Sequence, residues 1–329
     1  MKTILLWFLL LVFCVVALWI GRYEMGWRQI GCVFLSWFQE GICEQNRNAQ
    51  IILSLRLPRI VLEIFVGMGL AASGASFQSV FKNPLATPDI LGVSSGASFG
   101  AILGLVLGLG KMGMIAISLG FGFLALGVVA LIAKGSQEYG TIMLVLGGII
   151  VSALFQSFLS LIKYIADPQD VLPAITYWLL GSLQVSGFDE IYLGIIGIAM
   201  GCVIIYLFRW KLNILALDDD EARSLGIRLR FYRTLFICSS TLVVVFVVSM
   251  CGLIGWVGLL IPHMARLLRG SDNAEVIPLS LAFGAIFMVF LDTLSRSIST
   301  DEIPVSILSA LFGAPLFIYI LKNNKGIRL

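Results

Sequence analysis

One short block concentrates charge in an otherwise apolar chain: RWKLNILALDDDEARSLGIRLRFYR, residues 209–233. It holds six basic and four acidic residues between two long apolar runs. A charge at the centre of a bilayer costs about 2.5–3.5 kcal/mol on insertion scales, so this block cannot lie in hydrocarbon. We therefore predict a loop outside the membrane that separates two membrane-spanning helices.

The pattern inside the block indicates that the loop is folded. Asp218 can act as an N-cap, and Glu221 follows three residues later, which is an acidic variant of the capping box. Ala222 continues the turn, and Gly226 stands where a helix of this length needs a left-handed C-terminal residue. We predict a capped helix on the membrane surface that serves as a handle for another protein. The alternative is a loop helix that only links two spans.

Composition places the whole chain in the membrane. Of its 329 residues 59% are hydrophobic and 12% are charged, whereas a soluble domain carries about 25% charged residues. Only helices and closed barrels satisfy their backbones in lipid, and the long unalternating apolar runs exclude a barrel. We predict one all-α transmembrane domain over residues 1–329. The net charge of +3 comes from loops and gives no support for nucleic-acid binding.

Ten apolar stretches have the length of membrane spans: 4–20, 59–80, 92–109, 113–133, 141–163, 191–208, 234–251, 254–268, 278–294 and 304–321. With both termini cytoplasmic, fourteen of the 22 lysines and arginines fall inside, as the positive-inside rule requires. The run 172–185 is short, follows Pro168, and contains Pro173 and Gly181. We predict that it forms a surface or re-entrant helix and does not cross.

No segment carries a catalytic or energy-coupling site of its own. A phosphate-binding GxxxxGK[ST] loop is absent, and the single histidine, His263, has no metal-binding context. The six cysteines show no CxxC spacing, so we expect no metal or cofactor. Cys32 and Cys43 share one polar loop and could pair if that loop faces an oxidising compartment. We expect no enzyme activity here, and energy must come from a partner.

Four further motifs together point to one family. They are RLPRI at 56–60, KNPLATPDILG at 82–92, ALDDDEARSLGI at 216–227 and GLIGWVGLLIPHMARLLRG at 252–270. In this order they resemble the signatures of permeases of the iron-chelate and cobalamin family of ABC importers. The resemblance runs from about residue 56 to the C-terminus. Residues 1–55 match only in having one span and a polar loop.

This resemblance implies an assembly. Such permeases have ten helices per subunit and pair as dimers, of identical or different subunits. Two cytoplasmic ATPase subunits drive them, and an extracytoplasmic binding protein delivers the substrate. The block 209–233 resembles the coupling loop of the family, with Ala222 and Gly226 at its Ala-x-x-x-Gly positions.

The resemblance also gives a role to three arginines. Arg56, Arg59 and Arg296 resemble the residues that dock acidic side chains of the binding protein. Our topology separately places all three at the outer surface, and we expect their side chains to project from the helix ends. Arginine suits the role because its planar fork meets carboxylates bidentately. The alternative is interfacial snorkelling.

Two stripes on predicted helices show helical spacing. Small residues at Gly67, Ala71, Gly74 and Ala75 predict a packing seam. Polar residues recur at steps of four, four and three at Ser152, Gln156, Ser160 and Lys163. A polar stripe in lipid faces protein or water, and we predict that this one lines the translocation path. Ordinary helix–helix hydrogen bonding is the alternative.

The sequence therefore predicts the membrane-spanning subunit of an ATP-driven importer in the bacterial cytoplasmic (inner) membrane. We expect a metal chelate as substrate, and a ferric siderophore first among chelates. Haem, cobalamin and oxyanions stay open, because a weakly polar path selects size more than chemistry. A secondary transporter or channel that works alone is the competing class. The predicted cytoplasmic helix and the lack of charge chains inside spans argue against it.

Overall fold

The computed structural model describes residues 2–21, 31, 50–134, 140–299 and 301–323. Cys32 and Cys43 lie outside this part. Within it the regular structure is helical. Ten helices match the ten predicted spans: α1 (Lys2–Trp19), α4 (Leu57–Val80), α5 (Val93–Val106), α6 (Lys111–Ala133), α7 (Gly140–Ile165), α9 (Phe188–Leu207), α12 (Leu229–Cys251), α13 (Val257–Arg269), α14 (Asn273–Ile298) and α15 (Val305–Asn323).

Shorter elements join these helices. A π-helical turn, η1 (Ile52–Arg56), runs directly into α4, and a 3₁₀ turn, η2 (Pro88–Leu91), precedes α5. The others are α8 (Val171–Leu179), α10 (Arg209–Leu215) and α11 (Asp219–Ser224). Six described helices are long and apolar enough to cross a membrane, and α1, α5 and α15 contain shorter apolar stretches. The chain is a multi-pass membrane protein.

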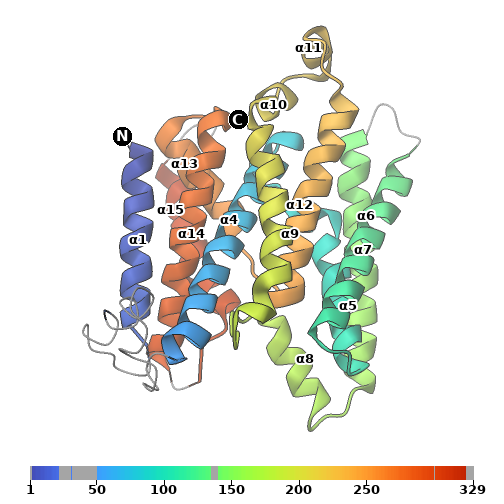
Figure 1. Cartoon of the computed structure of the whole chain (residues 1–329). Coiled ribbons are helices and arrows are strands. Elements are labelled where there is room, and N and C mark those ends of the chain that lie inside the picture. Colours follow the sequence, from blue (N-terminus) through green and yellow to red (C-terminus); the bar gives the residue numbers. More distant parts are fainter. Residues whose placement is uncertain (1, 22–30, 32–49, 135–139, 300, 324–329) are drawn as a thin grey trace.

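The two ends of the helix bundle differ (Figure 1). Helices α10 and α11 stand at one end, which we call the α11 end, and α8 stands at the other, the α8 end. Helix α1 begins and α15 finishes at the α11 end, as an even number of crossings requires. Helix α8 has nine residues, about 14 Å, which is half of the hydrocarbon thickness. The prediction that 172–185 does not cross is confirmed.

Helix α4 packs at the centre of the bundle through the predicted small-residue seam. A Cβ built at Gly67 would lie 2.1 Å from the carbonyl oxygen of Gly284 in α14. One built at Gly74 would lie 1.9 Å from that of Gly258 in α13. The backbones therefore touch, which is how helices pack in lipid. The predicted seam is confirmed.

Two of the predicted spans are shorter as helices than the sequence pattern indicated. Helix α5 has 14 residues and α13 has 13, about 20 Å each, so neither crosses the bilayer alone. Figure 1 shows α5 in the half near α8 and α13 in the half near α11. Helix α5 begins one residue after the predicted start but ends three residues early, where Gly108 turns the chain with φ +66°, and residues 252–256 form no helix. Irregular backbone at this depth is tolerated because protein surrounds it.

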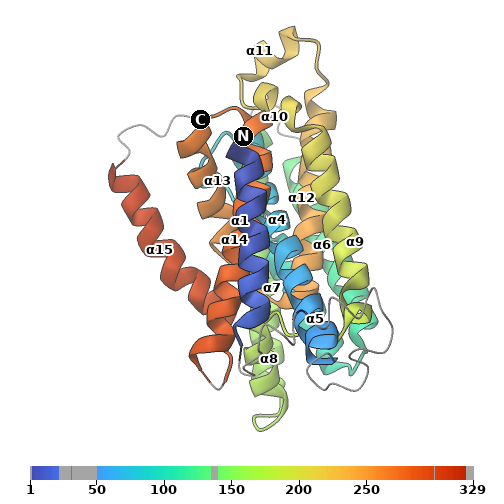
Figure 2. The ribbon, with the colours of Figure 1, turned by 60° about the vertical axis from the view of Figure 1, so that its left-hand side comes forward.

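Burial separates a core from a periphery. In the most apolar stretch of each helix, 78% of residues are buried in η1–α4 and 72% in α12, but only 28% in α6 and in α7. Figure 2 shows α15 leaning away from the other helices toward the α11 end. Helices α6 and α7 therefore present broad surfaces to lipid or to another protein.

Topology can be tested with two single cysteines. We expect Asp220→Cys, whose native side chain is 98% exposed at the α11 end, to resist an impermeant maleimide in sealed cells. Exposed Gln169→Cys, beside α8, should react. Background labelling of the parent chain is subtracted, and a permeable maleimide must label both variants. Reaction at 220 from outside would reverse the orientation.

Candidate translocation site

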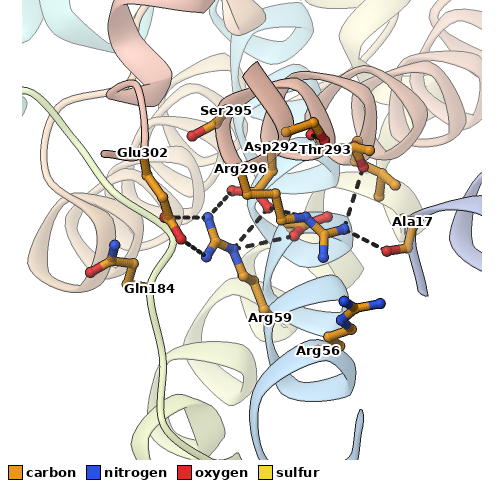
Figure 3. A network of polar contacts seen from close by, with 12 residues as sticks. Ala17, Arg56, Arg59, Gln184, Asp292, Thr293, Ser295, Arg296 and Glu302 are labelled. Carbon is orange, nitrogen blue, oxygen red and sulfur yellow. Dashed lines mark hydrogen bonds and ion pairs between the residues drawn. The ribbon is translucent and has the colours of Figure 1, made fainter. Parts of the chain in front are cut away.

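A buried ion network ties three helices together near the α8 end (Figure 3). Arg59 in α4 donates through Nε and Nη2 to the two carboxylate oxygens of Asp292 in α14, both at 2.8 Å. It also donates through Nη1 and Nη2 to Glu302, at 3.0 and 2.8 Å. Asp292 is fully buried and the Arg59 side chain is 10% exposed. Such a bidentate pairing is the arrangement that lets a charge persist out of water.

Arg296 and Arg56 extend this network to α1. Nε of Arg296 lies 3.5 Å from a carboxylate oxygen of Asp292. Nη2 of Arg296 donates to the carbonyl oxygen of Ala17 at 2.8 Å. Arg56 donates to the carbonyl oxygens of Leu18 and Trp19. These are the last carbonyls of α1, which have no partner within their own helix. The two arginines therefore cap α1 and hold it against α4 and α14.

The expectation that these three arginines project from the surface is wrong. Arg56, Arg59 and Arg296 are 6, 9 and 6% exposed. They do lie at the predicted end, but they face inward because buried carboxylates and helix carbonyls are there to receive them. Their docking role stays a prediction.

The sequence signal for the network was incomplete. Asp292 stands one helical turn before Arg296, but Glu302 is 243 residues from Arg59. Burial raises the pKa of Glu302, but the hydrogen bonds and charge of Arg59, together with a hydrogen bond from Gln184, outweigh it and hold that pKa below its ordinary value. Glu63 is also fully buried, with Oε1 3.9 Å from Nε of Arg59. Glu63 of α4 and Asp292 of α14 thus meet at one arginine.

A cavity of about 490 Å³ opens beside this network. The charged residues on its wall are Arg56, Arg59, Lys111, Arg296 and Glu302. Four of the five are basic, and three of these have carboxylate partners: Arg59 pairs with Asp292 and Glu302, Arg296 with Asp292, and Lys111 with Glu190.

The predicted polar stripe lies on α7. Gln156 and Ser160 are exposed, and Ser152 and Lys163 are half-buried. Ser160 donates to the carbonyl oxygen of Gln156 within its own helix, at 2.9 Å. The stripe thus points away from the core of this chain, and its role in translocation stays a prediction.

A second cavity of about 300 Å³ lies where α5 and α13 begin. Gln156 of α7, Trp256 and the segment Thr87–Asp89 line it, together with Ser94 and Ser95. Ser94 donates to the carboxylate of Asp89. Val244, Val247 and Ile254 complete an apolar wall. Among its lining residues Asp89 carries the only charge.

At the α11 end the charged block forms the predicted helix. Asp218 occupies the N-cap position with extended backbone, and Gly226 follows with φ +72°. The expected capping-box bond from the N-cap is not formed, since the Asp218 side chain accepts no cap bond in this helix. The helix is instead held by Ala222, which is fully buried, and by Asp219.

Asp219 connects α11 to two other segments. Its carboxylate accepts from Lys82 at 3.0 Å and from Arg233 at 2.6 and 3.1 Å. The hydrogen bonds from Arg233 lower its pKa most and burial opposes them, while the hydrogen bond from Lys82 and the charges of both cations help to bring the pKa to about 2. The sequence reading did not single it out among three consecutive aspartates.

The buried network can be tested by removing its central acid. Asp292→Ala removes the carboxylate that Arg59 and Arg296 share. Breaking a buried ion pair lowers the free energy of unfolding by about 3–5 kcal/mol. We expect a lower thermal unfolding midpoint of the purified protein in detergent. The control is Glu275→Gln in the same helix, whose pair with Arg269 is exposed and is worth about 0–1 kcal/mol. Equal midpoints for the two variants would contradict this role.

Comparisons with known proteins agree with the geometry. Residues 9–323 match the model of the FecCD transport family. The molybdate import system permease protein MolB of Haemophilus influenzae is 39% identical over 320 residues, which cover 97% of this chain and 94% of that protein. A probable iron chelatin transport system permease protein of Helicobacter pylori is 35% identical and covers 84% of both chains.

A solved structure supports the same assignment. The chain of a metal-chelate type ABC transporter in an inward-facing conformation has a TM-score of 0.89 and 37% identity, and the match covers 98% of this chain and 99% of that one. The protein described here thus belongs to the FecCD transport family and is a permease subunit of an ABC importer.

Proposed function

We propose that this permease forms, with a second permease subunit, the translocation path for a metal chelate, and that the chelate is a ferric siderophore. The observation that carries this proposal is the polar stripe of α7 beside the 300 Å³ cavity. Gln156 belongs to both. A second subunit against α7 would enclose the stripe, which in a single chain is open.

The lining of the cavity favours a chelate over a bare ion. Hydroxyls, one amide and apolar side chains surround it, and Asp89 is its only charged lining residue. A naked dianion would meet a carboxylate there and no cation, which is unfavourable at low dielectric. A chelate covers its metal with organic groups that such a wall accepts.

Molybdate is the second candidate. The relative named for molybdate import is 39% identical over nearly the whole chain. Haem and cobalamin belong to the same chelate class as the first candidate, and only transport measurements separate them.

The cavity of about 490 Å³ is our proposed contact for an extracytoplasmic binding protein. An acidic side chain entering it would approach Arg56, Arg59 and Arg296 from the α8 end, with Lys111 at the rim. The arginines are thus reached through a cavity. A charge reversal at Arg59 would place a fourth acid beside Glu63, Asp292 and Glu302, so it tests folding before it tests docking.

The opposite end is our proposed contact for the ATPase subunits. Asp218, Glu221 and Gly226 are exposed on α11, and buried Ala222 anchors the helix. This gives a rigid, acidic protrusion beyond the helix bundle (Figure 1).

Gly226→Val tests the coupling role of α11. No atom lies within 4 Å of a Cβ built at Gly226. The valine therefore destabilises the turn only through its positive φ, by about 1–2 kcal/mol. We expect ATP-driven uptake to fall while membrane insertion stays normal. Gly226→Asn is the matched control, because asparagine tolerates a left-handed backbone. Normal uptake by the valine variant with normal ATPase association would make α11 a simple linker.

Substrate class is tested by uptake in cells that lack this permease gene and are complemented with it. We expect complemented cells to accumulate ⁵⁵Fe supplied as a hydroxamate or catecholate siderophore, and not ⁹⁹Mo supplied as molybdate. Gln156→Leu should reduce the iron uptake. Restored ⁹⁹Mo uptake without ⁵⁵Fe uptake would select the molybdate alternative and overturn the chelate proposal.

A further inference from the structure

We propose that Asp219 is a positioning residue that carries the movement of α11 to the translocation cavity through Lys82 and the segment 82–92. The proposal rests on the ATPase contact proposed above for α11. It adds a physical route from that contact to the substrate path.

The first part of the route is a two-sided clamp on one carboxylate. Arg233, in the first turns of α12, binds Asp219 bidentately, and Lys82 binds it from the end of α4. The side chains are 42% exposed for Asp219, 29% for Lys82 and 24% for Arg233. Partial burial and three charge-assisted bonds fix the position of α11 better than a single exposed pair does.

The second part is the backbone at Lys82. This residue follows the last turn of α4 with φ +50°, one of two described non-glycine residues with positive φ. Its N–H donates to Ser79, and the next N–H donates to Gln78, which is a Schellman ending of the helix. Glycine is the usual residue at such a position. A lysine here is strained, and the strain is compensated by what its side chain binds.

The third part is the tight contact of the segment 82–92 with α7. A Cβ built at Gly148 would lie 1.9 Å from the carbonyl oxygen of Ile90. One built at Gly92, which has φ +70°, would lie 3.0 Å from the backbone nitrogen and Oγ of Ser152. The two backbones are therefore in direct contact, and a shift of this segment must displace α7.

The route ends at the cavity of about 300 Å³. Thr87, Pro88 and Asp89 of the segment form part of its wall, and Gln156 of α7 forms another part. Movement of α11 thus reaches the cavity through the Asp219–Lys82 ion pair and one close-packed segment. A local role, in which Asp219 only steadies α11 against α12, would use Arg233 and leave Lys82 without consequence.

Labelling of the cavity tests the route without knowledge of the substrate. Gln156→Cys is introduced into the complete transporter with its ATPase subunits, and its reaction rate with a water-soluble maleimide is measured with and without ATP and vanadate. The parent chain gives the background. We expect nucleotide to change the rate at 156, and Asp219→Asn or Lys82→Met to reduce that change by about tenfold.

Three controls separate positioning from stability. Asp220→Asn alters an acid that is 98% exposed and 3.8 Å from Arg223, and should leave the response intact. Lys82→Arg keeps the positive charge on a side chain of similar length and should retain the nucleotide response of labelling at 156. The double variant Lys82→Met with Asp219→Asn should lose no more than Asp219→Asn alone, because that single variant already removes the pair with Lys82.

The outcomes are distinct. If the ATPase copurifies with Asp219→Asn and the labelling response is normal, the route is wrong while the proposed function stands. If the ATPase no longer copurifies with Asp219→Asn, that residue is a docking contact and its positioning role is also overturned. If nucleotide changes labelling in no variant, including the parent with Gln156→Cys, the proposed function itself fails.

Discussion

The pairing of Arg59 with Asp292 and Glu302 is the constraint on which the rest of the structure depends. A guanidinium at this depth is stable only with carboxylates in hydrogen-bonding geometry, and here they come from α14 and from the segment before α15. Arg296 and Arg56 use the same neighbourhood to hold the end of α1. These contacts fix the rotation of α4 about its axis, and so direct Gly67 and Gly74 toward α14 and α13.

Helix α4 then connects the two ends of the molecule. Its 24 residues extend about 36 Å, from Arg59 in the buried network to Lys82 just beyond its last turn. One end therefore lies beside the cavity of about 490 Å³, and the other end binds the charged helix α11. The peripheral helices α6 and α7 are much less buried than α4. A buried central helix beside less buried peripheral helices fits an importer that has a partner at each end.

Much of this could be read from the sequence, because hydrophobic length and charge placement act locally. They gave the positions of the ten helices, the non-crossing α8 and the left-handed Gly226. The seam of Gly67 and Gly74 followed from spacing alone. What failed depends on contacts between distant segments. The burial of Arg59 requires Glu302, 243 residues away, and the short α5 and α13 are set by neighbours that shelter irregular backbone. Asp219 was hidden among equivalent aspartates, since only its position beside Lys82 and Arg233 distinguishes it.

The central claim is that this chain is the membrane-spanning part of a larger ATP-driven machine. It is tested most directly by native mass spectrometry of the complex purified through this chain from its own cells in mild detergent. The account predicts one mass that contains two permease subunits and two copies of an ATP-binding subunit. A chain that is recovered alone, or only as a dimer without an ATP-binding subunit, while transporting its substrate after reconstitution, would contradict it.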